Sequence, residues 1–194
     1  HVMRVYHLAT TIAKKEKDVD IEVLQATTLL HDIGGPKEIS DPSGGTCHAI
    51  VGAEMAEPIL KKLNFPTEKI THVQDCIVSH RSKTESEPKT IEAKIVFDAD
   101  KLDSIGAIGI ARAFCWVGDN NANIYKKPNI EEYIKENMQG KINGRIQDKT
   151  KHSPQIEFEV KYTFLIDKLY TETARDICRE RIQFFKHFLD QIGR

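Results

Sequence analysis

Apolar residues recur at helical spacing along most of the chain, and no segment shows the sustained alternation of a half-buried strand. The pattern therefore predicts an all-α fold. The expected helical segments are 1–16, 20–31, 47–63, 67–80, 90–117, 129–138 and two helices between 155 and 192. No internal repeat interrupts this series, so a single-domain helical bundle is expected.

Capping and helix-breaking residues predict the limits of the second helix. Asp20 precedes it as an N-cap, because its carboxylate can accept hydrogen bonds from the first unpaired backbone N–H groups. The residues at 34–36, Gly-Gly-Pro, stop this helix and leave His31 and Asp32 in its last turn. A loop rich in Gly, Ser, Pro and Asp is expected to follow as far as Thr46.

Small residues and caps predict where the later helices begin and break. The long helix over 90–117 is expected to bend at 104–106, because Ser and Gly tolerate a break. Asn129 and Glu132 read as a capping box that opens a short helix. The C-terminal helical region is expected to break near 170–171.

The composition indicates one soluble globular domain. The 194 residues are 40% hydrophobic and 29% charged, which is enough to bury a core without disulfides. The net charge of -1 provides no whole-protein field for nucleic acid or an acidic membrane, so an anionic ligand must meet a local cluster of cations. No apolar run reaches the length of a membrane span, and the four cysteines form no CxxC pair. We expect a cytoplasmic protein with reduced thiols.

The candidate chemistry lies in three strings, HVMRV at 1–5, LLHDIGG at 29–35 and DADKLDSIGAIGIAR at 98–112. His31 and Asp32 are adjacent, so their side chains diverge on a continuous helix but can converge on one ion at a helix end. A divalent metal accepts imidazole nitrogen and carboxylate oxygen together. His1 and Asp100 would complete such a site across a helical bundle.

The order of one histidine, a His-Asp pair and a later aspartate, in the contexts HxxRV, LLHDIG and DADKLD, resembles the HD-domain metal-dependent phosphohydrolase superfamily. The resemblance covers residues 1–115, and the tail at 170–192 is similar to that of small bacterial and archaeal HD hydrolases, some of which are nucleotide pyrophosphohydrolases. It implies an all-α fold and hydrolysis of a phosphate ester or anhydride. It also implies a divalent metal such as Mn²⁺, Mg²⁺, Ni²⁺, Zn²⁺ or Fe, with one ion expected and a second left open.

The resemblance also implies the metal ligands by position. His1 matches the first family histidine, and His31 with Asp32 matches the HD pair. Asp100 matches the final aspartate, for which Asp98 is the rival. The family places this ligand immediately before a Lys/Arg-Leu step, which favours Asp100 and leaves Asp98 to orient a neighbour.

Further residues are candidates for contact with the substrate. The family often has lysine where this chain has Gly35, and Lys37 is the expected substitute. His48 and His80 are expected to contact phosphate or bind a second metal; the alternative is that one caps a helix and the other ends one.

Cations and one carboxylate complete the predicted machinery. Ammonium and guanidinium groups suit phosphate oxygens, although lone cations are often only solvated surface groups. Asp103 lies three residues after Asp100 and can hold the attacking water, unless it is an ordinary surface carboxylate. We predict Lys101 and Asp103 as catalytic residues. The predicted substrate-binding residues are His48, His80, Arg81, Arg112 and Lys37.

The expected partner is a small phosphorylated molecule, namely a nucleotide, rather than a membrane or a nucleic acid polymer. A homodimer is left open. Two alternatives to hydrolysis also stay open. Some HD-type proteins are di-iron oxygenases, which would require His48 and His80 as iron ligands. A nucleotide sensor without catalysis is the other alternative, favoured by Gly35 in place of the usual lysine.

Three regions are expected within the one domain. Residues 1–118 form the HD core with the metal site, 119–154 a short helix and a basic loop, and 155–194 helices that pack on the core. The part of the loop at 139–154 is either a lid that covers the site and holds phosphate or a solvated connection. Its cations are Lys141, Arg145, Lys149 and Lys151.

Overall fold

The computed structural model describes residues 1–81, 86–127, 129–142 and 144–193. Within these residues the chain is helical and contains no strand, which confirms the predicted all-α fold. None of the described helices is long and apolar enough to cross a membrane. The chain forms two compact units, residues 1–100 with 170–174 and residues 101–169 with 175–194.

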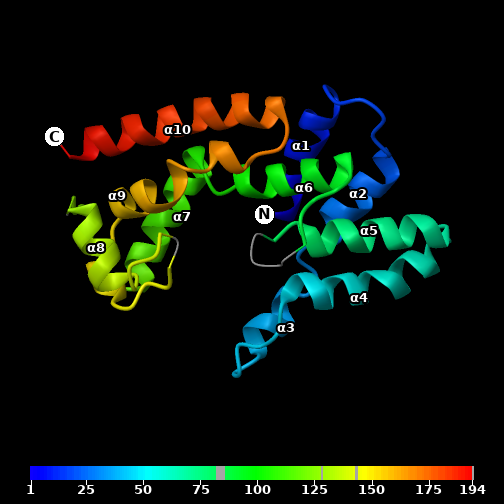
Figure 1. Ribbon diagram of the computed structural model, residues 1–194, viewed down its shortest axis with the longest axis horizontal. Helices are drawn as coiled ribbons and strands as arrows, with labels where there is room; N and C mark the ends of the chain where they lie inside the picture. The colour runs from blue at the N-terminus through cyan, green and yellow to red at the C-terminus, as the bar shows by residue number, and fades with distance from the viewer. Residues whose placement is uncertain (82–85, 128, 143, 194) are drawn as a thin grey trace. The chain divides into compact units, whose positions relative to one another are not determined.

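The first unit contains the predicted ligand residues. Its helices are α1 (Val2–Ala13), α2 (Ile21–Leu30), α3 (Gly35–Ser40), α4 (His48–Lys62), α5 (Thr67–Ser79) and α6 (Ile91–Leu102), of which α6 reaches the unit boundary. α4 and α5 lie side by side, and α5 packs against α2 (Figure 1). The apolar residues between them are fully or almost fully buried: Val23, Ala53, Ala56, Leu60, Ile70, Val73, Cys76, Ile77 and Ala93.

The start of α2 follows the predicted capping. The Asp20 carboxylate accepts hydrogen bonds from the backbone N–H groups of Glu22 and Val23, both at 3.1 Å. These bonds satisfy two of the donors that a helix leaves unpaired at its start. The helix ends at Leu30, so His31 stands directly after its last residue.

The segment after the His-Asp pair differs from the prediction. A loop was expected from residue 37 to 46, but Gly35–Ser40 forms the short helix α3. Pro36 lies in its first turn, where a missing N–H costs nothing and the fixed φ suits a helix. Gly34 is required here for space, since a Cβ atom would lie 2.3 Å from the carbonyl oxygen of His48. The glycine therefore lets the start of α4 approach the turn that carries Asp32.

The second unit contains the remaining helices. These are α7 (Gly106–Asp119), α8 (Ile130–Asn137), α9 (Pro154–Glu157) and most of α10 (Glu172–Ile192). A π-helical turn at Phe158–Tyr162 and 3₁₀ turns at Lys149–Lys151 and Ile166–Lys168 separate them. One predicted helix between 155 and 170 is thus a series of short turns, whereas the break before α10 is confirmed. The capping role of Asn129 is also confirmed, because its side chain accepts from the N–H groups of Glu131 and Glu132.

The long helix expected over 90–117 is interrupted at the predicted place. α6 ends at Leu102 and α7 begins at Gly106, which has a positive φ of 76° that other residues rarely adopt. Asp98 is completely buried and accepts hydrogen bonds from the N–H groups of Tyr170 and Thr171. Asp98 therefore holds the backbone before α10, and its role toward a neighbouring ligand stays a prediction.

The basic segment at 139–154 is held in place by side-chain hydrogen bonds. The Asn137 amide accepts from the Asp148 N–H at 2.7 Å and donates to the Asp148 carbonyl at 2.9 Å. Asn123 donates to the Thr150 carbonyl at 2.7 Å. Asn143 lies outside the described residues. The second half of the segment is thus connected to the rest of the second unit by these hydrogen bonds.

Candidate metal centre

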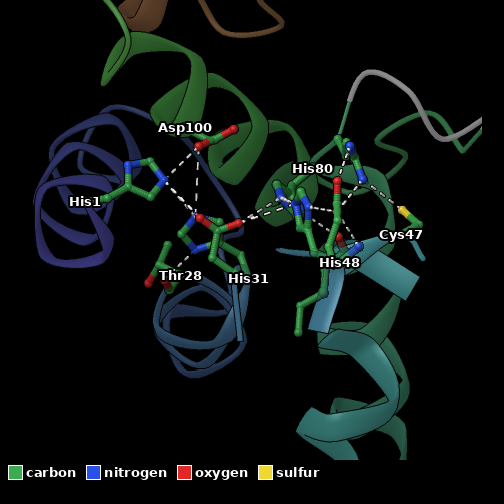
Figure 2. Close-up of polar contacts among 11 residues, drawn as sticks. His1, Thr28, His31, Cys47, His48, His80 and Asp100 are labelled. Carbon is green, nitrogen blue, oxygen red and sulfur yellow. Dashed lines mark hydrogen bonds and ion pairs between the residues drawn. The ribbon is translucent and has the colours of Figure 1, made fainter. Parts of the chain in front are cut away.

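The first group of candidate ligands comes from the starts and ends of three helices. His1 precedes α1, His31 follows α2 and Asp100 lies in the last turn of α6. The Nε2 atom of His1 is 3.2 Å from Nε2 of His31 and 3.1 Å from Oδ1 of Asp100 (Figure 2). These three ligand atoms lie within 4.8 Å of one another, which is close enough to share one ion.

The second group lies on the other side of Asp32. Nε2 of His48, at the start of α4, is 3.3 Å from Nε2 of His80, which follows α5. The Asp32 Oδ1 atom is 3.4 Å from the His48 nitrogen and 3.7 Å from the His80 nitrogen. Asp32, His48 and His80 thus form a second set of donors of the kind that holds a metal ion.

Asp32 connects the two groups. While Oδ1 faces His48 and His80, Oδ2 lies 3.4 Å from Nε2 of His1 and 3.6 Å from Nε2 of His31. Each carboxylate oxygen therefore faces a different pair of imidazoles. Histidine nitrogen and carboxylate oxygen suit Zn, Fe, Ni and Mn ions, and a carboxylate can bridge two of them.

Hydrogen bonds fix which nitrogen of three imidazoles carries the proton. Nδ1 of His31 contacts the Thr28 carbonyl at 2.9 Å, Nδ1 of His80 contacts the Ile77 carbonyl, and Nδ1 of His48 contacts the Glu38 carboxylate at 2.6 Å. Carbonyl and carboxylate oxygens only accept, so we assign the proton of each neutral ring to Nδ1. Each Nε2 atom then presents a lone pair toward the centre.

This assignment provides a test of whether the residues fit a metal. In the neutral rings the Nε2 lone pairs of His48 and His80 face one another at 3.3 Å, which is repulsive unless a cation or a proton lies between them. Backbone carbonyls and carboxylates are also the usual partners of the second nitrogen in metal-binding histidines. The donor set therefore fits divalent metal ions.

The ionisation states favour metal binding at neutral pH. Burial lowers the pKa of His31, which is completely inaccessible to solvent, so its ring is neutral. The neighbouring imidazoles, His80 foremost and His31 after it, lower the pKa of Asp32 to about 2, although burial acts in the opposite direction. Metal ligands must be deprotonated to bind. His31 and Asp32 meet this requirement at neutral pH.

Arg81 forms an ion pair that the sequence does not predict. Its guanidinium forms a two-pronged ion pair with Glu38, with Nη1 to Oε2 at 2.8 Å and Nη2 to Oε1 at 2.9 Å. Nη1 also donates to Sγ of Cys47 at 3.3 Å. The N–H of His48 and the Arg81 guanidinium together lower the pKa of Glu38 to about 2. The prediction that Arg81 holds substrate phosphate is untested, but its guanidinium is committed to Glu38 here.

The other predicted contact residues lie outside this cluster or in the second unit. Lys37 is exposed in α3. Lys101, Asp103 and Arg112 belong to the second unit, where Oδ2 of the buried Asp103 lies 4.0 Å from Nη1 of Arg112. Their roles toward a substrate stay predictions. Glu38 was missed by the sequence analysis, because no motif or spacing distinguishes it from other acidic residues of the polar segment.

Comparison with known proteins identifies relatives along the whole chain. Residues 1–105 match the model of the HD domain family. The Bacillus subtilis protein YpgQ is 31% identical over 199 residues, which cover 99% of this chain and 80% of YpgQ. The 3'-5' exoribonuclease YhaM of Bacillus licheniformis is 30% identical over 117 residues, but these are only 54% of this chain and 37% of YhaM.

Solved structures agree with these matches. The crystal structure of YpgQ in complex with ADP has a TM-score of 0.66 at 26% identity, and the match covers 99% of this chain and 85% of that chain. A predicted HD superfamily hydrolase from an uncultured Thermotogales bacterium has a TM-score of 0.64 at 28% identity, covering 99% and 77%. The family match spans more than half of the chain and contains the six histidines and aspartates described above. The chain belongs to the HD domain family.

Proposed function

We propose that the protein is a metal-dependent phosphohydrolase that hydrolyses a phosphate ester or anhydride of a nucleotide. The observation that carries the proposal is the position of the Asp32 carboxylate between two pairs of imidazoles, 3.4 to 3.7 Å from their Nε2 atoms. Such a set suits two divalent ions, one held by His1, His31, Asp32 and Asp100 and the other by Asp32 with His48 and His80. This extends the one-ion expectation from the sequence to a two-ion site.

The nucleotide part of the proposal rests on a relative. The solved structure of YpgQ contains ADP, and YpgQ aligns with nearly the whole of this chain. A net charge of -1 favours a small ligand over a nucleic acid polymer, which needs an extended basic surface. We therefore favour a nucleotide over the RNA that the partial relative YhaM degrades.

The residues of the chain contribute orientation and charge. Divalent ions supply Lewis acidity and activation of water for attack on phosphorus. His31 and His80 are held by the backbone carbonyls before them, so their lone pairs stay directed toward the centre. Asp32, with 37% of its side chain exposed, lies where a bound phosphate can reach the centre from solvent.

The test is a panel of substrates and ions. Nucleoside mono-, di- and triphosphates, cyclic nucleotides and a generic phosphoester are each incubated with Mn²⁺, Mg²⁺, Ni²⁺, Zn²⁺ or Fe²⁺, and released phosphate or pyrophosphate is measured. We expect hydrolysis of at least one nucleotide that depends on the ion and stops with a chelator. Binding of nucleotide without any hydrolysis would contradict the proposal and indicate a nucleotide sensor.

One observation favours a second candidate. A di-iron oxygenase of the HD type requires His48 and His80 as iron ligands, and the structure brings both to Asp32. Metal analysis of protein purified without added metal, together with its visible absorption spectrum, separates the two activities. Two tightly held irons with visible absorption would favour the oxygenase, whereas a colourless protein activated by Mn²⁺ or Mg²⁺ would favour the hydrolase.

A further inference from the structure

Glu38 lies in a polar segment, yet its carboxylate makes several hydrogen bonds to His48 of the second ligand group and to Arg81. Its Oε2 atom accepts from the backbone N–H of His48 at 2.8 Å and from Nδ1 of the same residue at 2.6 Å. The same oxygen accepts from Nη1 of Arg81 at 2.8 Å, and Oε1 accepts from Nη2 at 2.9 Å. One carboxylate therefore joins the start of α4 to the residue after His80.

These bonds fix both the proton and the direction of the His48 ring. A carboxylate cannot donate, so Nδ1 must carry the proton and Nε2 must keep the lone pair that faces His80 and Asp32. The backbone N–H of His48 donates to the same oxygen, so the carboxylate is tied to the main chain of His48 and fixes the direction of its ring. Without Glu38 the Nδ1 proton loses its acceptor, and the ring can carry the proton on Nε2 instead. Nε2 then has no lone pair to offer a metal ion.

Arg81 extends this control to the second histidine. It follows His80 directly in the chain, and its planar guanidinium grips both Glu38 oxygens. The side chains of His48, Glu38 and Arg81 are only 20%, 30% and 19% exposed, so these bonds are partly shielded from water. Figure 2 shows His48 and His80 side by side with Cys47 beyond them, where Sγ accepts from Arg81 at 3.3 Å.

We propose that Glu38, held by Arg81, is a positioning residue that fixes the tautomer of His48 and its distance from His80. The proposal rests on the proposed metal centre for its function, but the tautomer itself is a property of the metal-free protein. It also gives Arg81 a role in the site without contact with phosphate. Carboxylates that orient metal-binding histidines typically change metal affinity by 10- to 100-fold when they are removed.

The experiment compares Glu38→Ala with Glu54→Ala, an exposed glutamate on α4, as a matched control. Long-range ¹⁵N–¹H NMR of the metal-free proteins at pH 8 reports which nitrogen of each imidazole carries the proton, and His48→Gln identifies the His48 signals. We expect a proton on Nδ1 of His48 in the unchanged protein and in Glu54→Ala. In Glu38→Ala we expect a mixture of tautomers.

Mn²⁺ titration followed by calorimetry provides the second readout. We expect Glu38→Ala to weaken, by about 10- to 100-fold, only the binding step that is also lost in His48→Gln.

If Glu38→Ala loses its helical circular dichroism, Glu38→Gln is used instead. A smaller weakening of the same binding step is then expected, because the amide keeps one acceptor. If the unchanged protein binds no Mn²⁺, the proposed function fails while the NMR result still decides the role of Glu38. An unchanged His48 tautomer in Glu38→Ala, or Mn²⁺ binding by the Glu38 variants that equals that of the unchanged protein, would overturn the proposal.

Discussion

Asp32 directs its two carboxylate oxygens at different imidazole pairs, so a single side chain belongs to both ligand groups. The neighbouring imidazoles, His80 foremost, lower its pKa to about 2, so the carboxylate is ionised at neutral pH. If two ions bind as proposed, removing Asp32 should affect both at once, while the loss of a single histidine should affect one. The apolar core of the first unit does not include this residue.

Asp32→Ala is expected to abolish metal retention and hydrolysis and to leave the helical circular dichroism unchanged, because it removes an anionic ligand and no core side chain. Metal content after gel filtration is measured by mass spectrometry. Asp75→Ala, an exposed aspartate on α5, is the matched control and should behave like the unchanged protein. Near-normal metal content in Asp32→Ala would contradict the assignment.

The sequence predicts that some site residues lie close together but does not predict this for others. Three ordered strings predict that His1, His31 and Asp100 meet, and the structure places their ligand atoms within 4.8 Å of one another. Glu38 and Arg81 are 43 residues apart and carry no motif. Their ion pair exists only once the fold has brought α3 next to the residues that follow α5, so residue patterns alone cannot predict it.

At the level of helices, the caps and breaks were predictable because they depend on local chemistry. The Asp20 cap and the interruption before Gly106 are examples. α3 was not predictable, since six residues are too few for an apolar stripe and its Ile39 is 88% exposed. The need for glycine at position 34 was also not predictable, because it arises from the close approach of the α4 backbone.

Gly34→Ala should disturb both stability and the site. Its Cβ atom would lie 2.3 Å from the His48 carbonyl oxygen and 2.8 Å from the Gly52 nitrogen, so α4 must move. We expect a loss of about 3 kcal/mol in the free energy of unfolding and weaker binding of the ion at His48. Gly35→Ala is the control, because nothing lies within 4 Å of its added Cβ. Equal stability of the two variants in urea denaturation would contradict the packing role of Gly34.

The basic segment at 139–154 keeps its predicted role as a candidate phosphate contact, with a solvated connection as the alternative. Lys149→Ala combined with Lys151→Ala should raise KM for a nucleoside triphosphate several-fold more than for a monophosphate, since the additional anionic groups lose their partners. Metal content should not change. Equal effects on both substrates, or none, would identify the segment as a solvated connection.

On the scale of the whole molecule, the two units have separate buried polar groups. In the second unit His152 is buried between the Tyr133 hydroxyl at 2.8 Å and the Glu157 carboxylate at 3.1 Å, and its ring also contacts that of Trp116.

The predicted limits of the domain regions at residues 118 and 154 stay predictions, while the boundary between the two compact units follows Asp100. The division cannot be read from the sequence, because α6 continues through it as one helix.

Glu157 should make the stability of the second unit depend on pH. Burial acts to raise its pKa, but the hydrogen bond with His152 and the charge of Lys161 outweigh it and lower the value from 4.5 to about 2. A lowered folded-state pKa contributes stability above pH 4.5 that is lost as the pH falls toward 2. Glu157→Gln should cost roughly 1 to 3 kcal/mol at pH 7 and less at pH 3. Urea unfolding followed by Trp116 fluorescence measures this, and a difference that is constant with pH would contradict the prediction.

The central claim is that Asp32 is shared by two metal ions. Crystals soaked in Mn²⁺ and measured at the manganese absorption edge test it most directly, because anomalous difference density locates the ions without reference to the protein. We expect two peaks, one beside Oδ2 of Asp32 near His1, His31 and Asp100 and one beside Oδ1 near His48 and His80. A map with no peak, or with only one, within about 2.5 Å of the Asp32 oxygens would contradict the claim.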